Sequence, residues 1–108
     1  MITAILNVMA IEGGRTIAFN VITDQDGANE VVSVTLEGQR FETLVQGGPD
    51  IGGVRLSIPL TQPAITPSSI GRYRVALVAE SSGITSSLTD LHLRFKEPGP
   101  RGQPPNPG

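Results

Sequence analysis

The chain has 108 residues, of which 38% are hydrophobic, so it can bury one core and is too short for two ordinary domains. Its formal net charge of −2 provides no basic field for phosphate backbones, which argues against nucleic-acid binding. Cysteine is absent, which excludes disulfides, thiolate nucleophiles and cysteine-based metal sites and favours synthesis in a reducing cytosol.

The first segment predicts a strand with two partly apolar faces. Between residues 2 and 10, even-numbered apolar residues alternate with an odd-numbered set that is only partly polar, so both faces should be covered. The segment MITAILNVMAIEGGRT lacks the basic n-region, the long apolar h-region and the cleavage site of a signal peptide. No stretch approaches the roughly 20 apolar residues needed to span a bilayer, so we expect synthesis in the cytoplasm and no membrane insertion.

Turn residues divide the rest of the chain into six further strands. Pro59 cannot donate to a ladder, so the strand that contains it should lie at a sheet edge or end there. The segment Thr61–Ile70 contains two prolines and suits a crossover between sheets. Turns are expected at Gly13-Gly14, 24–27 and 38–40, and a glycine-rich loop at 47–53. The expected strands are 2–10, 16–21, 32–37, 41–45, 54–60, 71–79 and 86–95.

Alternation assigns inward and outward side chains in several of these strands, in the half-buried pattern of antiparallel sheets. The positions expected to face the core include Val32, Val34, Leu36, Tyr73, Val75, Leu77, Ala79, Leu91, Leu93 and Phe95. The positions expected to face solvent include Arg72, Arg74, Glu80, His92, Arg94 and Lys96. Two packed sheets of about seven strands are the most economical architecture for this pattern, and a barrel is the alternative.

The segment Gly71-Arg72-Tyr73-Arg74-Val75 resembles the sixth strand of immunoglobulin-like domains. That strand commonly opens with Gly-x-Tyr-x-Cys, its tyrosine hydroxyl returning to the upstream backbone, and the last strand ends in Leu-x-Val. Gly71 and Tyr73 fit this pattern, and Leu93-Arg94-Phe95 resembles the end of the last strand. Val75 stands in the cysteine's place and tryptophan is absent, so fibronectin type III domains, which also lack the disulfide, are a similar match.

The strand pattern and the resemblance together predict an all-β fold with one domain and a tail. Residues 1–96 are expected to form an immunoglobulin-like antiparallel two-sheet sandwich of about seven strands. Residues 97–108, EPGPRGQPPNPG, cannot form a ladder or a helix and should be a disordered or extended tail rich in proline and glycine. Such a tail suits an arm along a neighbouring subunit or a stalk.

The sequence contains no convincing active site. His92 is the single histidine and Asp90 lies on the same strand face, but an exposed histidine beside a carboxylate is the simpler interpretation. Asp24-Gln25-Asp26-Gly27 resembles part of a calcium loop, yet only two carboxylates stand close together, so a β-turn is favoured. We expect no enzymatic activity, no cofactor and no metal ion.

Three groups of residues are candidates for binding a protein partner. If the strands 71–79 and 86–95 pair, their outward basic residues form a stripe that suits an acidic surface. The alternative is a solvated face whose charge is balanced by Glu80 and Asp90. The other groups are the odd-numbered apolar residues of the first strand and the tail. The candidates are Ile5, Met9, Ile11, Arg72, Arg74, Arg94, Lys96, Pro98, Pro100, Arg101, Pro104 and Pro105.

Small immunoglobulin-like proteins with this profile resemble the accessory, or decoration, proteins of bacteriophage capsids and tails. The resemblance implies a virion surface protein, made in the host cytoplasm, that attaches to a repeated lattice of major capsid or tail subunits. It also allows a homo-oligomer and weak binding to cell-surface glycans. The alternative is a non-viral adhesion or scaffold module that binds a protein or glycan through the loops 24–30 and 47–53.

Overall fold

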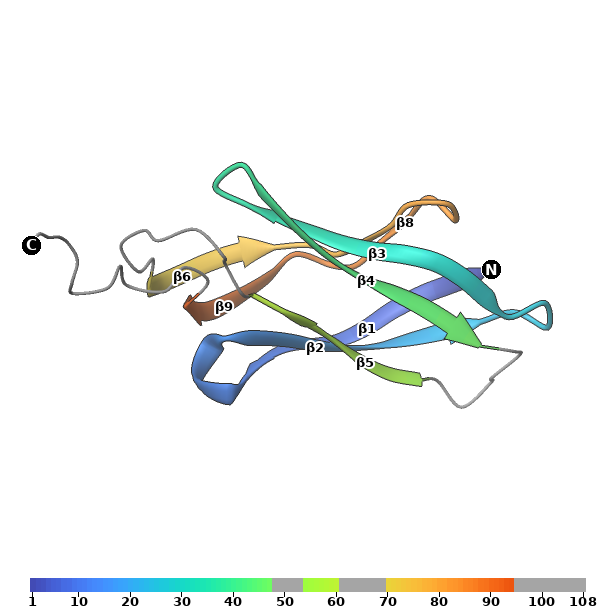
Figure 1. Cartoon of the computed structure of the whole chain (residues 1–108), viewed down its shortest axis with the longest axis horizontal. Helices are drawn as coiled ribbons and strands as arrows, with labels where there is room; N and C mark the ends of the chain where they lie inside the picture. The colour runs from blue at the N-terminus through green and yellow to red at the C-terminus, as the bar shows by residue number, and fades with distance from the viewer. Residues whose placement is uncertain (48–53, 61–69, 95–108) are drawn as a thin grey trace, which may run out of the picture.

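The computed structural model describes residues 1–47, 54–60 and 70–94, which form an all-β fold (Figure 1). In these ranges the helical content is a three-residue 3-10 turn, η1 (Glu12–Gly14), and no helix is long and apolar enough to cross a membrane. The strands are β1 (Ile2–Ile11), β2 (Thr16–Thr23), β3 (Ala28–Leu36), β4 (Gln39–Gly47), β5 (Val54–Pro59), β6 (Ile70–Val75), β7 (Val78–Ala79), β8 (Ile84–Thr85) and β9 (Thr89–Arg94).

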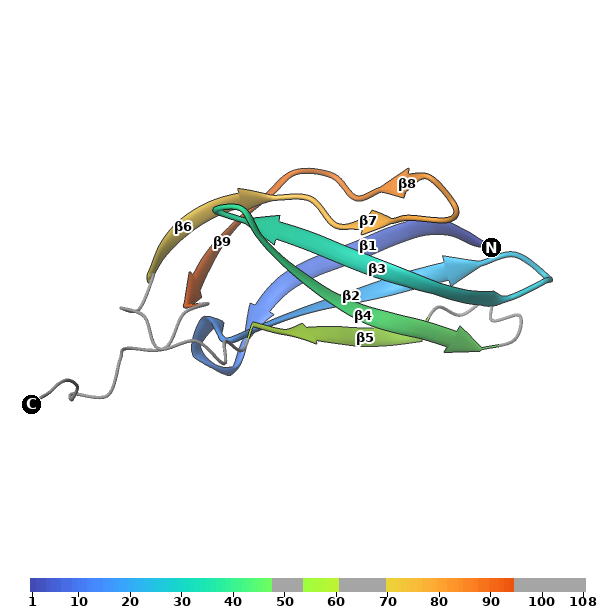
Figure 2. The same ribbon diagram turned by 45° about the horizontal axis from the view of Figure 1, so that its top comes forward.

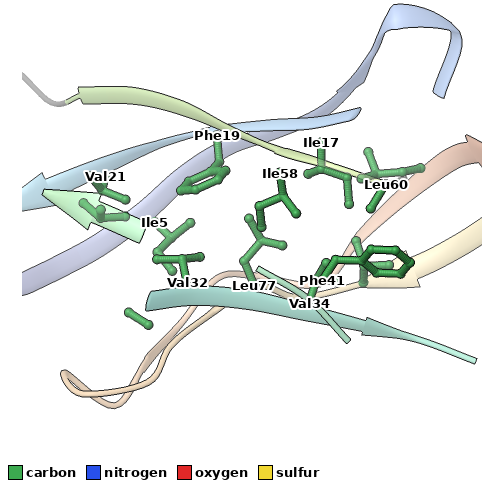
Figure 3. Packing of buried hydrophobic residues seen from close by; sticks show 14 of the residues in the cluster. Ile5, Ile17, Phe19, Val21, Val32, Val34, Phe41, Ile58, Leu60 and Leu77 are labelled. Carbon is green, nitrogen blue, oxygen red and sulfur yellow. The ribbon is translucent and has the colours of Figure 1, made fainter. Parts of the chain in front are cut away.

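The strands form antiparallel sheets in the orders β1-β2-β5, β4-β3-β7-β8 and β6-β9. Side chains from β2 and β5 meet side chains from β3 in the space between the sheets, as Figure 3 shows for Phe19, Ile58 and Val32. All three are fully buried, because alternate residues of each strand point to the same side. The core therefore lies between β1-β2-β5 on one side and the remaining strands on the other.

Most of the predicted alternation is confirmed. Val32, Val34 and Leu36 are buried on β3, and Leu91 and Leu93 are buried on β9. In 71–79, Val75, Leu77 and Ala79 are buried, Tyr73 packs partly buried against the core, and Arg72, Arg74 and Glu80 are exposed. The strand that contains Pro59 lies at the edge of its sheet and ends at that proline, as expected. The predicted crossover over 61–69 and Phe95 lie outside the described residues.

The predicted strand 71–79 is divided into β6 and β7, and the predicted strand 86–95 contains β9, which begins at Thr89, while β8 precedes it. Val75 pairs with Thr89, and Val78 pairs with Thr85. Two residues (76–77) therefore connect β6 to β7, whereas three residues (86–88) connect β8 to β9. Ser86 bridges this mismatch: its hydroxyl accepts from the Leu77 N–H at 2.9 Å, and its own N–H donates to the Leu77 carbonyl at 2.8 Å. The chain thus makes one long kinked hairpin, with β6 and β9 in one part and β7 and β8 in the other (Figure 2).

The prediction that Ile5 lies on the outer face of the first strand was wrong. The register of β1 against β2 shifts between Ile2 and Ala4 and again between Leu6 and Met9, and Asn7 has a φ of 55°. Each β-bulge adds a residue, so the side chains after it change face. As a result Ile5 is 5% exposed and lies in the core, not on the outer face with Met9.

The turn predicted at 38–40 lies one residue earlier. β3 and β4 are joined by Glu37 and Gly38, which have φ values of 49° and 78°, and Leu36 pairs directly with Gln39. Two central residues with positive φ define a type I′ hairpin, which usually contains Asn-Gly rather than Glu-Gly. Gln39 and Arg40 therefore belong to β4.

Candidate binding surfaces

The basic stripe is assembled as expected by the pairing of β6 with β9. This pairing sets Arg72 opposite His92 and Arg74 opposite Asp90, and all four side chains are exposed. Arg94 is half-buried at the end of the same face. The sequence-predicted residues of this group are thus brought together, except Lys96, which lies outside the described residues.

Asp90 is engaged by the arginines of this face. Its carboxylate accepts a hydrogen bond from Arg74 Nε at 3.0 Å, and that bond, followed by the charges of Arg74 and Arg72, lowers the pKa of Asp90. The same bond raises the pKa of Arg74. Because the two side chains are 67% and 53% exposed, solvent screens the pair and it contributes little to stability. The carboxylate nearest His92 is therefore bound to a guanidinium group.

The second expected counter-charge of the stripe, Glu80, belongs to a different surface. Its carboxylate accepts from Ser33 Oγ at 2.7 Å and from Arg40 at 2.6 Å, on the outer side of the sheet β4-β3-β7-β8. The bond from Arg40 and then that from Ser33 lower the pKa of Glu80. The interpretation that Glu80 balances the β6–β9 stripe was wrong, because Arg40 on β4 binds it instead. No sequence signal indicates this contact, since β3, β4 and β7 meet only in the folded chain.

The outer side of β1 and β2 carries an apolar patch. Met9 lies opposite Ala18, and Leu6 lies next to it along β1 on the same side. Leu6 and Met9 are 47% and 45% exposed, while Ala18 is covered between Met9 and Ser57 on the neighbouring strands. We call this patch the β1–β2 apolar face. Asn20, opposite Leu6, lies within it and accepts from Asn7 and Arg55, and its apolar members are Ala4, Leu6, Met9, Ile11, Ala18 and Ile22. Of the three residues predicted here, Met9 and Ile11 belong to it and Ile5 does not.

The segment Asp24 to Gly27 is a turn, as predicted. The Gly27 N–H donates to the Asp24 carbonyl at 3.0 Å, and the Asp24 carboxylate accepts from the Asp26 N–H at 3.0 Å. The same carboxylate receives the N-terminal ammonium group at 2.6 Å, and this bond is the main cause of the lowered pKa of Asp24. The carboxylate therefore serves to join the turn to the start of β1. No group of three acidic, histidine or cysteine side chains that could hold a metal ion occurs in the residues the structure describes.

Sequence reasoning missed a buried carboxylate, Glu30 on β3. Its side chain is 6% exposed and accepts hydrogen bonds from the N–H of Ser82, at 2.9 Å, and from the Ser82 hydroxyl. Burial raises the pKa of Glu30, but the bonds from Ser82 and from the N–H groups of Ile2 and Ser81 outweigh it, so the net pKa is lowered. Glu30 thus ties the start of β1 and the 80–83 turn to β3.

The remaining predicted positions cannot be placed on any of these surfaces. The loop 48–53 and the tail lie outside the described residues, and with them Pro98, Pro100, Arg101, Pro104 and Pro105. No family model, curated protein or solved structure matches the chain. The described surfaces themselves are therefore the basis for assigning a function.

Proposed function

We propose that this chain is a non-enzymatic binding protein that attaches to a protein partner through the β1–β2 apolar face. The observation that carries the proposal is the exposure of Leu6 and Met9, at 47% and 45%, beside Ala18 on the neighbouring strand. A partner that covered them would remove apolar surface from water at about 25 cal/mol per Å². The bulges of β1 are what turn both side chains outward.

We infer that the framework is an immunoglobulin-like sandwich. In immunoglobulin domains, strands A, B and E share one sheet and strands C, F and G share the other. The order β1-β2-β5 corresponds to the first set, and β3 with the kinked β6–β9 hairpin corresponds to the second. The burial of Val75 in the position of the usual cysteine supports the same inference. The hydroxyl of Tyr73 donates to the Glu37 carboxylate at 2.9 Å, and the backbone of 61–69, upstream of Tyr73, lies outside the described residues.

The proposed partner is a capsid or tail subunit repeated on the surface of a bacteriophage. This part of the proposal is supported by the resemblance of residues 71–75 and by the absence of cysteine, and it is an argument by analogy. The β6–β9 stripe would add a second contact with an acidic surface, because Arg72 is exposed and Arg74 is only partly neutralised by Asp90. The proposed location is the virion surface.

The proposal predicts saturable attachment that depends on the β1–β2 apolar face. Phage particles assembled without the chain would be mixed with increasing amounts of it, sedimented, and analysed for copies bound. The double variant Leu6→Lys with Met9→Lys places two charges in the proposed contact and should lower occupancy at least about tenfold, because a buried unpaired charge costs several kcal/mol.

Leu88→Lys is the matched control, since Leu88 is 65% exposed in the segment between β8 and β9. It should bind like the wild type. Equal occupancy for the double variant and the control would contradict the proposed surface. Of the predicted loop 24–30, residues 28–30 belong to β3 and the turn is 24–27, so binding that does not saturate on particles, but is lost when Gln25 and Asp26 are changed, would favour the adhesion-module alternative.

A further inference from the structure

β1 and β4 each lie at the edge of a sheet, and they differ in how their edges are protected. β1 has two register shifts, which disrupt an edge and discourage further pairing. β4 pairs with β3 through nine consecutive residue pairs without a shift, from Ala28–Gly47 to Leu36–Gln39. Among the described strands, none pairs with the other side of β4. β4 is therefore a long, regular edge strand.

The type I′ turn determines which backbone groups of β4 are available. In a two-residue hairpin the closing pair, here Leu36 and Gln39, exchanges both hydrogen bonds, and bonded pairs alternate with unbonded pairs along the strands. Thr43 therefore bonds to β3, whereas Arg40 and Glu42 direct their N–H and C=O groups away from it. The side chains of both residues are exposed on the outer side of the sheet.

The backbone of the first half of β4 lies away from β5, while Phe41 packs into the core. Figure 1 and Figure 2 both show that the C-terminal end of β4 approaches β5, and that β4 diverges from β5 toward the hairpin with β3. The segment around Arg40 and Glu42 lies in the diverging half. A further strand can therefore reach these backbone groups without displacing β5.

We propose that the free edge of β4 binds β4 of a second copy of this chain, antiparallel, with Arg40 of each copy opposite Glu42 of the other. A ladder between the two copies forms only where residues whose N–H and C=O groups point away from β3 lie opposite each other. Arg40 opposite Arg40, or Glu42 opposite Glu42, sets like charges against each other, which destabilises a pair. The register between these two has its twofold axis at Phe41. It sets Arg40 of each copy opposite Glu42 of the other, which makes two opposite-charge pairs. It is the self-complementary one.

Within a single copy, Arg40 already lies between two carboxylates, and one of them can be replaced by its counterpart from the second copy. Arg40 binds Glu42 on its own strand and Glu80 directly after β7, so the guanidinium group is held over the outer side of the sheet by one partner that does not take part in pairing. On pairing, Arg40 exchanges its own Glu42 for Glu42 of the second copy and keeps Glu80. Leu44, which is 51% exposed, then lies opposite Gly38, where no side chain obstructs it. Pairing thus leaves no charge without a partner.

The direct test is backbone hydrogen exchange of the full chain, followed by NMR at increasing protein concentration. The amides of Arg40 and Glu42 should exchange more slowly as concentration rises, by about tenfold or more at dimer saturation, because they enter a new ladder. The Thr43 amide, already bonded to β3, is the internal control and should not change. Sedimentation over the same range should show a monomer–dimer equilibrium. A monomer at all concentrations to the millimolar range, or a dimer without slower exchange at Arg40 and Glu42, overturns the proposal.

A charge-exchange cycle tests the register. It is made in a Glu80→Gln background, so that reversing the charge at Arg40 creates no repulsion with residue 80, and the double variant also keeps the opposite-charge pair between residues 40 and 42 within each copy. Arg40→Glu alone and Glu42→Arg alone should each weaken association by about tenfold or more, since each converts two opposite-charge pairs to like-charge pairs. The double variant should restore it. Association that is equal in all variants, or a double variant as weak as the singles, contradicts this register, and thermal unfolding checks that each variant is folded.

Discussion

At the scale of single residues, Gly14 shows how closely two elements can approach. It has a φ of +88°, and a Cβ at this position would lie 2.7 Å from the carbonyl oxygen of His92 on β9. Gly13, its neighbour in η1, has a φ of +70° with nothing within 4 Å of an added Cβ. Both glycines therefore adopt a positive φ that disfavours other residues. Only Gly14 must also lack a side chain so that the backbones of η1 and β9 can come into contact.

We expect Gly14→Ala to lower the free energy of unfolding by about 2–5 kcal/mol, from the left-handed conformation and from overpacking against β9. Gly13→Ala should cost about 1–2 kcal/mol, from the conformation alone. Urea denaturation of both variants measures the difference. Equal losses would mean that η1 shifts away from β9 at little cost, contrary to the close contact described.

At the scale of elements, the kinked hairpin depends on one hydroxyl group. Ser86 is 8% exposed and supplies the acceptor for the N–H of Leu77, which is fully buried. Ser86→Ala leaves this N–H without its acceptor and should cost about 1–3 kcal/mol. The matched control is Ser87→Ala, because Ser87 is exposed and participates through its backbone carbonyl. Urea denaturation should show a loss for Ser86→Ala and almost none for the control.

A second measurement locates the effect of Ser86. Amide exchange at Leu77 should become faster in Ser86→Ala by more than the loss of global stability explains, since the amide then lacks its partner. If the Leu77 amide stays as protected as in the wild type while stability is unchanged, the hydroxyl is not the bridge between the two parts of the hairpin.

The individual strands also differ in how well the sequence predicted which side chains face the core. Alternation was sufficient for β3 and β9, because their pattern is not interrupted by a bulge. It failed for Ile5 in β1, because the register shift between Ile2 and Ala4 changes the face of the side chains that follow, until the second shift at Asn7 changes it back. It also misplaced the turn at Glu37, because a glutamate with positive φ is rare and nothing in Glu-Gly distinguishes it from the residues that follow.

At the scale of the whole molecule, the sequence predicted the candidate surfaces only where one strand pair defines them. The β6–β9 stripe follows from two neighbouring strands and their alternation, so it could be predicted. The contact of Glu80 with Arg40 joins β7 to β4 across β3, and that of Glu30 with Ser82 joins residues 52 positions apart. Such contacts depend on strand order, which a single sequence does not reveal.

Glu30 gives the whole molecule a dependence on pH that can be assigned to one residue. Its pKa in the folded state lies below the ordinary value of 4.5, because hydrogen bonds from Ser82, Ile2 and Ser81 outweigh burial. A carboxyl group with a lowered folded-state pKa stabilises the fold above its unfolded pKa. That stability is fully present above about pH 4.5 and is lost as the pH falls through the lower, folded-state value.

We therefore expect Glu30→Gln to lower the free energy of unfolding by about 1–3 kcal/mol at neutral pH, since an amide cannot accept all the bonds that the carboxylate receives. The difference from the wild type should shrink as the pH falls below about 4.5, where protonation of the wild-type carboxyl removes the same advantage. Ser82→Ala removes the hydroxyl donor, leaves the backbone N–H of residue 82 in place, and should reduce the pH dependence in the same direction. Urea denaturation between pH 7 and pH 3 measures all three proteins. A difference that stays constant across this range would show that Glu30 contributes through packing, and that its charge does not hold β1, β3 and the 80–83 turn together.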